Sequence, residues 1–309
     1  SFSAVLDVIC PPGTIPSDLQ PEFDGFRDRL VEAIAESDDD LADKYLEGEE
    51  LSQDEILMGA REAIRKGNLV PILTTSATKN IGVKELAEFI QEFMPSPIDG
   101  IRPTVSDESG NKLSIEVDTG APMAGLVFKT TADPFVGKLS VFRVYQGTII
   151  SNSEIWNSGR KQSERVGQLY LPRGKSQDNV SEVSAGDMGA VGKLSSTVTG
   201  DTLCVKESPM VFDRVQFPVG FYSVAVAPAT KADLDKMSTS LTRIVEEDPT
   251  LHLSRQPDTG EMVLTGFGEA QIDVTVDKIK RKFGAELITR LPRVPYRETI
   301  TRTAQSEYR

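Results

Sequence analysis

The sequence predicts a multi-domain protein that contains an α/β unit, a small β-barrel and an α+β sandwich with the element order βαββαβ. Two observations support this prediction. The chain has 309 residues, and one hydrophobic core rarely serves more than roughly 250 to 300. The spacing of apolar residues also changes along the chain, from helical to alternating and then to a mixture of both. We therefore expect domains at residues 1–98, 99–212 and 213–291, followed by a segment at 292–309.

The first predicted domain combines short apolar runs with amphipathic helices. Residues 2–9 and 69–73 are apolar runs of strand length, and we expect each of them to form a strand. Ser52 and Glu55 have the spacing of a capping box, which predicts the start of a helix. Apolar residues recur at helical spacing in three segments, which are 23–34, 56–64 and 83–93. A strand, a turn and a helix in succession are typical of an α/β domain.

The second predicted domain is a series of short β-rich segments. Gly, Asn, Ser or Asp separates them, and strands at such spacing predict a small β-barrel. The segments are 125–131, 138–145, 148–152, 168–171 and 188–191. Pro95, Pro97 and Pro103 precede the series, so we place a boundary near residue 98 and expect either a hinge or an ordinary linker there.

The third predicted domain alternates strands and helices. Leu234, Met237 and Leu241 have helical spacing, and Thr230 is placed to cap that helix. Residues 271–282 fit both a strand and a helix, and we favour a helix because the segment is long and ends in Lys and Arg. The expected strands are 221–227, 251–255, 261–265 and 285–288. This order is that of a ferredoxin-like βαββαβ sandwich.

The net charge of −13 is concentrated in one segment. Residues 18–55 hold 15 acidic and 3 basic residues, which amounts to −12. Residues 278–302 hold 8 basic and 2 acidic residues, a local charge of +6. Because attraction to phosphate acts over about a Debye length, the basic segment predicts either an RNA-facing side or a lysine-rich helix face.

The sequence offers no obvious set of residues for hydrolysis or metal binding. It has one histidine, His252, and two distant cysteines, Cys10 and Cys204, which cannot assemble a zinc site or a Ser/His/Asp triad. We expect no catalytic residue and no metal site. The absence of an 18-residue apolar run and of a CxxC pair predicts a cytoplasmic protein with no membrane partner. The start without Met predicts a cut end.

Short motifs in a fixed order carry a resemblance to a known family. Residues 75–80 lie between an apolar run and a helix, as the fifth guanine-binding motif of a GTPase does. The other motifs are 44–49, 94–99, 133–139, 143–147, 185–187, 199–203, 246–250, 266–269 and 294–300. Together they closely resemble bacterial translation elongation factor G over essentially the whole chain.

The resemblance implies an identity for each domain. Residues 1–98 would be the end of a P-loop GTPase G domain with the tail of its inserted subdomain. Residues 99–212 would be the translation-factor β-barrel, domain II, and residues 213–291 the ferredoxin-like domain III. Residues 292–309 would be the first strand of domain IV. The parent would couple GTP hydrolysis to tRNA and mRNA translocation, and this chain would be its ribosome-contacting and force-transmitting middle.

The resemblance also implies what this fragment lacks. In the family the P-loop, switch, DxxG and NKxD motifs precede this part of the chain, and we interpret the DxxG spacing of Asp107–Gly110 as a chance match in a polar linker. We therefore expect the fragment to be inactive alone. GTP or GDP with Mg²⁺ would bind the intact parent, and no cofactor is expected in the fragment. The expected remnant of the nucleotide site is Ser76, Ala77 and Thr78.

Two sets of contact residues follow from the same resemblance. The candidate RNA contacts are Arg143, Arg160, Arg165, Arg173 and Lys175. The candidates for a face between domains are Gly266, Gly268, Glu269 and Gln271. The expected partners are ribosomal RNA and a small-subunit protein, and we expect a monomer.

One departure from the family pattern is Gln271, which stands where elongation factor G usually has His. It favours an elongation factor G-like paralogue. Two alternatives stay open, a ribosome-protection or recycling paralogue and a non-catalytic ribosome-binding module whose likeness to a GTPase is only inherited.

Overall fold

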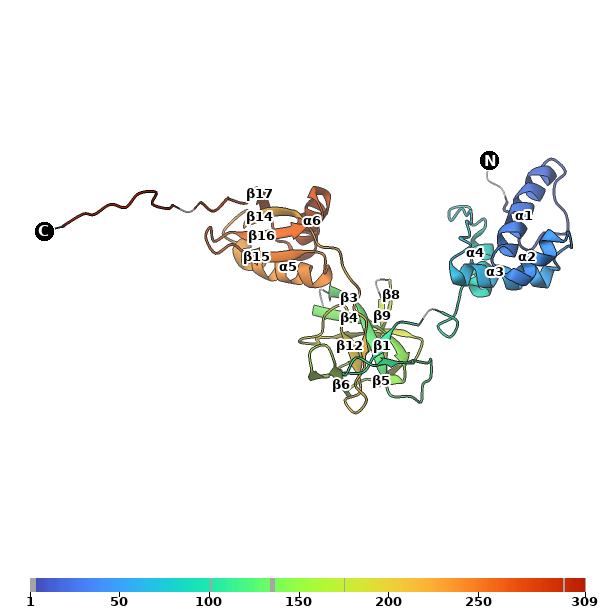
Figure 1. The fold of residues 1–309 in the computed structure, drawn as a ribbon, viewed down its shortest axis with the longest axis horizontal. Coiled ribbons are helices and arrows are strands. Elements are labelled where there is room, and N and C mark those ends of the chain that lie inside the picture. Colours follow the sequence, from blue (N-terminus) through green and yellow to red (C-terminus); the bar gives the residue numbers. More distant parts are fainter. Residues whose placement is uncertain (1–3, 101, 134–136, 175, 297, 309) are drawn as a thin grey trace. The chain divides into compact units, whose positions relative to one another are not determined.

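The computed structural model describes residues 4–308 except 101, 134–136, 175 and 297. The chain divides into two compact units, Ser1–Ile101 and Arg102–Arg309. Figure 1 shows the first unit in blue to teal and the second in green to red. The second unit contains a β-barrel and an α+β sandwich, each with its own core. The boundary predicted near residue 98 lies three residues before the division between the units.

Four helices form the first unit within residues 4–100. They are α1 Gln20–Ala35, α2 Asp39–Leu46, α3 Gln53–Lys66 and α4 Val83–Phe93. The three helices predicted from apolar spacing are confirmed as α1, α3 and α4, whereas α2 was not predicted. Ser52 caps α3 as expected, because its hydroxyl accepts from the Glu55 N–H and the Glu55 carboxylate accepts from the Ser52 N–H. Ile34, Ile56 and Ala60 are at most 3% exposed and form the core.

The two strands predicted in this unit are wrong. Residues 4–9 and 69–73 form no strand, and residues 2–3 of the first prediction lie outside the described residues. Val70 and Ile72 in the second run are 77% and 91% exposed. A strand needs a neighbour for its N–H and C=O groups, and the described residues of this unit supply none. Up to Gly100 the described residues therefore form a helical unit instead of the predicted α/β domain.

An antiparallel sheet of eight strands forms most of the barrel, in the order β7-β6-β12-β3-β4-β11-β8-β9. Its strands are β3 Ala124–Asp133, β4 Gly137–Gln146, β6 Glu154–Asn157, β7 Gln162–Arg165, β8 Leu169–Arg173, β9 Ser176–Val180, β11 Met188–Gly192 and β12 Thr202–Cys204. Two small sheets contain β5 Thr148–Ile150 with β10 Glu182–Ser184, and β1 Val105–Ser106 with β2 Lys112–Leu113 and β13 Val211–Phe212. The five predicted strands are confirmed as β3, β4, β5, β8 and β11.

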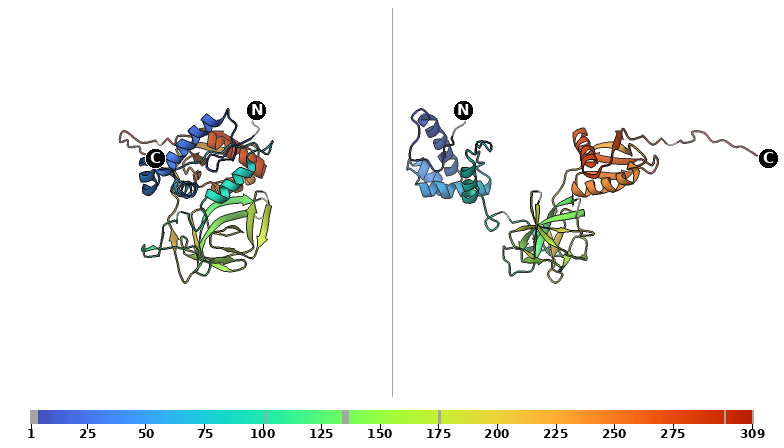
Figure 2. Two further views of the ribbon diagram at one scale, coloured as in Figure 1. Left: turned by 90° about the vertical axis from the view of Figure 1, so that its right-hand side faces the viewer. Right: turned by 180° about the vertical axis from the view of Figure 1, so that it is seen from behind.

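One core contains side chains from strands near both edges of the large sheet. Val127 on β3, Phe142 on β4, Ile155 on β6, Leu169 on β8 and Leu203 on β12 belong to one buried cluster, and each is at most 3% exposed. Strands β6 and β8 lie near opposite edges of the sheet, so the sheet must curl to bring their side chains together. The left view of Figure 2 shows this curvature.

The buried carboxylate of Asp201, which is 1% exposed, connects loops of the barrel. Its Oδ2 accepts from Asn157 Nδ2 at 3.1 Å, Arg160 Nε at 3.2 Å and the Val198 N–H at 3.0 Å. Its Oδ1 accepts from Arg214 Nη2 at 3.1 Å. A buried carboxylate is stable only when it is paired and hydrogen-bonded, so the motif that contains Asp201 has a structural role.

Glu164 on β7 is a second buried carboxylate, 6% exposed. Its Oε2 accepts from the Ser195 N–H at 2.5 Å, and its Oε1 accepts from the hydroxyls of Ser196, at 2.8 Å, and Thr197. Burial alone would raise the pKa of Glu164, but the hydroxyls of Thr197 and Ser196 and the two serine amides together hold it below its usual value. Glu164 thus fixes the loop after β11 to strand β7.

The sandwich has the predicted βαββαβ order. Its elements are β14 Tyr222–Pro228, α5 Asp233–Glu247, β15 His252–Arg255, β16 Met262–Gly266, α6 Glu269–Phe283 and β17 Leu287–Arg290. The strands form an antiparallel sheet in the order β15-β16-β14-β17, as in ferredoxin-like folds. Leu241 and Ile244 of α5 pack with Ile272 and Ile279 of α6 and Leu264 of β16 in one core. The ambiguous stretch 271–282 is helical, as favoured.

Two details of this region differ from the predictions. Thr230 does not cap α5, because Ala232 occupies the N-cap position, and the Thr230 hydroxyl donates instead to Asp233 Oδ2 at 2.6 Å. The described residues from Leu291 to Tyr308 form no strand, so the opening strand predicted at 292–309 is not observed. The reason is the same as in the first unit, since no neighbouring strand pairs with these residues.

We predict that Glu164→Gln makes the barrel less stable at neutral pH and its stability less dependent on pH. Because the folded-state pKa is lowered, the charged carboxylate contributes stability that is fully present above the unfolded pKa of about 4.3 and is lost as pH falls through the folded pKa. We expect a loss of about 1 to 3 kcal/mol at about pH 7 and a smaller difference from the wild type in acid.

Urea unfolding followed by the fluorescence of Trp156, which lies on β6 of the barrel, measures this difference. Glu154→Gln, at an exposed position of the neighbouring strand β6, serves as the control. Parallel pH profiles for the wild type and Glu164→Gln would contradict the assignment.

Candidate functional site

The loop 75–81 is a tight turn in front of α4. The Ser76 N–H donates to the Ile81 carbonyl at 2.9 Å, and the Ile81 N–H donates back at 3.1 Å. Ala77 and Thr78 are exposed, and within the described residues the Ala77 N–H donates no backbone hydrogen bond. The turn therefore leaves this amide available to an external acceptor, such as the edge of a base. The nucleotide-binding role of Ser76, Ala77 and Thr78 stays a prediction.

Two of the predicted RNA-contacting arginines are engaged within the barrel. Arg160 is part of the network around buried Asp201. Arg173 pairs with Asp178 across the β8–β9 hairpin. A cation that already has a carboxylate partner attracts phosphate less strongly, so these two arginines are the weaker candidates.

Two other arginines keep their charge available. Arg143 on β4 is half-buried and Arg165 on β7 is exposed. Neither forms an ion pair with any described residue. Lys175, the fifth candidate, lies outside the described residues. Of the five candidates, Arg143 and Arg165 are therefore the best suited to contact RNA. That role stays a prediction.

The basic segment near the C-terminus is largely neutralised within the sandwich. Its ion pairs join Lys278 and Lys282 to Glu247, Lys280 to Glu286, Arg281 to Asp277, and Arg290 and Arg293 to Glu261. Most of these cations are partly exposed and each lies against a carboxylate. Of the two interpretations of the local charge of +6, the lysine-rich helix face fits these contacts better.

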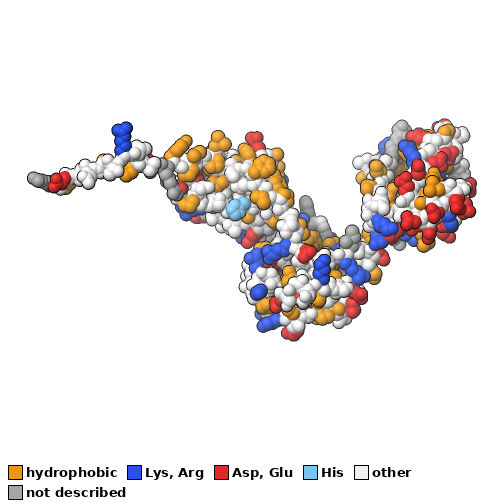
Figure 3. Space-filling view, in the orientation of Figure 1, with side chains coloured by type: hydrophobic (Ala, Val, Ile, Leu, Met, Phe, Trp, Pro, Cys, Tyr) orange, Lys and Arg blue, Asp and Glu red, His pale blue; other side chains and the backbone are white. Residues whose placement is uncertain are grey.

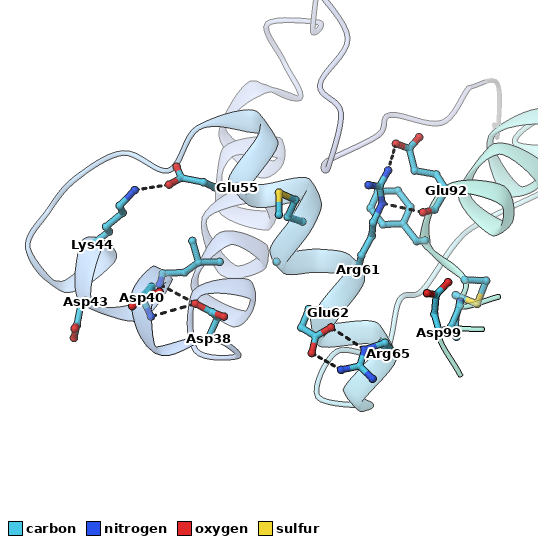
Figure 4. Close-up of a pocket in the computed structure, with 16 residues that line it drawn as sticks. Asp38, Asp40, Asp43, Lys44, Glu55, Arg61, Glu62, Arg65, Glu92 and Asp99 are labelled. Atoms are coloured by element: carbon cyan, nitrogen blue, oxygen red, sulfur yellow. Dashed lines mark hydrogen bonds and ion pairs between the residues drawn. The ribbon is translucent and has the colours of Figure 1, made fainter. Parts of the chain in front are cut away.

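Acidic side chains gather over the first unit (Figure 3). A groove of about 1030 Å³ lies along α2, α3 and the end of α4, and seven carboxylates and three cations line it. The cations lie against neighbouring carboxylates (Figure 4): Lys44 against Glu55, Arg61 against Glu92 at 2.8 Å and Arg65 against Glu62 at 2.6 Å. The groove thus has a net charge of −4 and would repel a phosphate group.

Neither a membrane span nor a metal centre is found in the described parts of the chain. No helix there combines the length and the apolarity that a bilayer crossing demands. No group of three or more His, Cys, Asp or Glu side chains there is placed to hold a metal ion.

The last turn of α5 brings Glu246 and Glu247 to the contact between sandwich and barrel, and a third acidic residue, Asp248, is the C-cap of the helix. Acidic residues are unfavourable at a helix C-terminus because they face the negative end of the helix dipole, so they need compensating partners. Glu247, whose side chain is 5% exposed, accepts from the N–H of Ala132 on β3 at 2.5 Å and from Lys282. Lys278 Nζ lies 2.8 Å from its Oε2 as an ion pair without the angle of a hydrogen bond.

These donors set the charge state of Glu247. Burial alone would raise its pKa, but the ammonium groups of Lys278 and Lys282 and the Ala132 amide hold it below the usual value. Glu246 also faces the barrel, with its Oε1 4.0 Å from Lys138 Nζ on β4. Sequence reasoning did not single out Glu247, although its position at a helix C-terminus with no basic residue in the last turn was a usable signal.

Gln271, in the first turns of α6, connects two turns of the sandwich. Its Oε1 accepts from the Phe267 N–H at 2.6 Å. Its Nε2 donates to Thr250 Oγ1 at 2.8 Å and to Asp248 Oδ2 at 3.2 Å. A Cβ at Gly266 would lie 2.6 Å from Gln271 Oε1, so only glycine leaves room for this amide. The observed contacts of Gln271 are therefore within the sandwich.

The other candidates for a face between domains lie around the same turn. Gly266 is buried at the end of β16, Gly268 is the N-cap of α6, and Glu269 is exposed at the first position of that helix. The structure brings these residues together with Gln271. Their role toward another domain stays a prediction.

Comparison with known proteins identifies two domains in the second unit. Residues 122–206 match the family model of elongation factor G domain 2, and residues 217–290 match that of elongation factor G, domain III. Both ranges fall inside the predicted barrel and sandwich. The chain is also similar to a protein from Thermus thermophilus whose crystal structure is known, with a TM-score of 0.71 and 31% sequence identity over 92% of this chain. It spans 40% of the length of that protein chain.

We predict that Gln271→Glu destabilises the sandwich at neutral pH and much less in acid. The new carboxylate keeps an acceptor for the Phe267 N–H, but it loses the two amide donors and places a like charge beside Asp248. We expect a loss of about 1 to 2 kcal/mol near pH 7, which shrinks once the carboxylate is protonated near about pH 4.

Thermal unfolding, monitored by circular dichroism near pH 7 and below about pH 4, tests this prediction. Asp273→Asn, at an exposed position on the same helix, is the matched control. An equal loss at both pH values would show that charge at position 271 does not matter.

Proposed function

Because the chain belongs to the elongation factor G-like family, we propose that it is the ribosome-contacting and force-transmitting middle of a translational GTPase. The whole protein would couple GTP hydrolysis to tRNA and mRNA translocation. The observation that supports this role most is the contact at Glu247, where the domain III helix α5 meets the domain 2 strand β3. Movement is transmitted between sites when packed domains move as units, and this contact packs the two domains against each other.

The nucleotide would bind mainly outside the residues of this chain. GTP or GDP with Mg²⁺ would be the cofactor of the whole protein, and Ser76, Ala77 and Thr78 would supply one wall of the guanine site. The amide of Ala77, which donates no backbone hydrogen bond to a described residue, supports this assignment. The chain alone would hold no nucleotide and would have no GTPase activity.

The partners of the chain would be ribosomal RNA and a small-subunit protein. Arg143 and Arg165 would contact phosphate groups, since no described carboxylate neutralises them. A monomeric protein of the cytoplasm fits this role. Gln271 favours an elongation factor G-like paralogue as the second candidate, because it replaces a titratable side chain at a family motif.

We predict that the chain alone does not bind GTP with micromolar affinity. Micromolar binding needs about 8 kcal/mol, whereas a single amide contributes about 0.5 to 1.5 kcal/mol. Isothermal titration calorimetry with GTP and Mg²⁺ measures this directly, with a full-length elongation factor G as the positive control. A micromolar dissociation constant for this chain would contradict the proposed remnant site.

We predict that the double variant Arg143→Ala/Arg165→Ala binds ribosomes about tenfold more weakly than the wild type. Loss of two phosphate contacts should also lower the slope of log affinity against log salt by about 1 to 2. Co-sedimentation with ribosomes over a range of salt concentrations measures both effects. Arg281→Ala, whose charge is paired with Asp277, is the matched control. Equal binding by the wild type and the double variant would exclude these two arginines.

A further inference from the structure

The far end of the β3–β4 hairpin has an edge that no strand among the described residues of the barrel covers. Strand β12 pairs with β3 only through residues 124–126, while β3 runs on to Asp133. On its other side β3 pairs with β4, where Ala132 lies opposite Lys138. Backbone N–H groups on a free edge need partners when they are buried, and Ala132 is 7% exposed.

Helix α5 of the sandwich covers this edge and supplies the missing acceptor. Glu247 Oε1 accepts from the Ala132 N–H, and Glu246 Oε1 lies 4.0 Å from Lys138 Nζ. Two successive glutamates thus meet two residues that are neighbours across one hairpin. The pairing joins positions 115 residues apart in the chain.

We propose that Glu247 is an interdomain clamp that holds the barrel and the sandwich together as one body. Its carboxylate is the only described side-chain acceptor that takes a backbone N–H from the other domain. Lys278 and Lys282 complete the clamp from α6 by neutralising the buried charge.

The clamp is asymmetric, which makes it reversible. Both lysines belong to the sandwich, so the charge of Glu247 stays compensated there when the barrel moves away. On the barrel side the Ala132 N–H loses its acceptor and Lys138 loses its contact with Glu246, and water can then bind both groups. Opening therefore leaves no unpaired buried charge in either domain. This inference rests on contacts within the chain and holds whether or not the proposed ribosomal function is correct.

The test measures the distance between the two domains in the full chain. Spin labels at Glu154→Cys in the barrel and Asp235→Cys in α5 report it, in a Cys10→Ser background that leaves only buried Cys204 unlabelled. The wild type should give one narrow distance distribution. Glu247→Ala should broaden it, and the Ala132 amide should exchange with solvent at least about tenfold faster.

A barrel-side variant separates loss of the clamp from loss of sandwich stability. Ala132→Pro removes the N–H that Glu247 accepts, at an edge position where proline is tolerated, and leaves the chemistry of the sandwich unchanged. It should broaden the distance distribution as Glu247→Ala does, while the thermal unfolding of the sandwich stays that of the wild type. Asp277→Ala removes an exposed ion pair of α6, between Asp277 and Arg281, and should change neither readout.

Each outcome bears on the proposal. Broad distributions in both Glu247→Ala and Ala132→Pro support the clamp. A narrow, wild-type distribution in Ala132→Pro would overturn it, even if Glu247→Ala unfolds the sandwich. Broadening by Asp277→Ala as well would also overturn it, because the effect would then follow the loss of any acidic side chain in the sandwich.

Discussion

Buried carboxylates must find several donors, and this requirement fixes the junctions of the second unit. A carboxylate that leaves water loses a large solvation free energy, which only close cations and hydrogen-bond donors offset. Asp201 and Glu164 meet the requirement between loops of the barrel, and Glu247 meets it between the barrel and the sandwich. Glu261 does the same where the chain leaves the sandwich, because it pairs with Arg290 and accepts from the Arg293 N–H.

Elements with a clear apolar period could be predicted from the sequence, because a buried face leaves a local pattern. Helices α1, α3, α4, α5 and α6 and the long strands β3 and β4 are of this kind. Strands β7 and β9 were missed because Gln162–Arg165 and Ser176–Val180 are almost entirely polar, and their strand pairing decides their structure. Residues 69–73 show the opposite case, in which a strand-like pattern has no partner to pair with.

The candidate site was less predictable, since the partner of a charged side chain is distant in sequence. Arg160 has the appearance of a free surface cation until Asp201, 41 residues later, is placed against it. The basic segment of α6 likewise lost most of its apparent attraction for RNA once Glu247 and Asp277 were placed beside its lysines and arginines. The sequence could supply the charged residues that are candidates for binding RNA. The structure shows that several of them contact carboxylates within the chain.

Gln271 shows why the identity of one side chain matters within such a network. It accepts at Oε1 and donates at Nε2 at the same time, and an amide keeps both roles at every physiological pH. A neutral imidazole at this position could also accept once and donate once. A protonated imidazole has two donors and no acceptor, so the Phe267 N–H would lose its partner near neutral pH. The amide therefore makes the connection between the turn at Phe267 and the turn at Asp248, next to Glu247, independent of the protonation of residue 271.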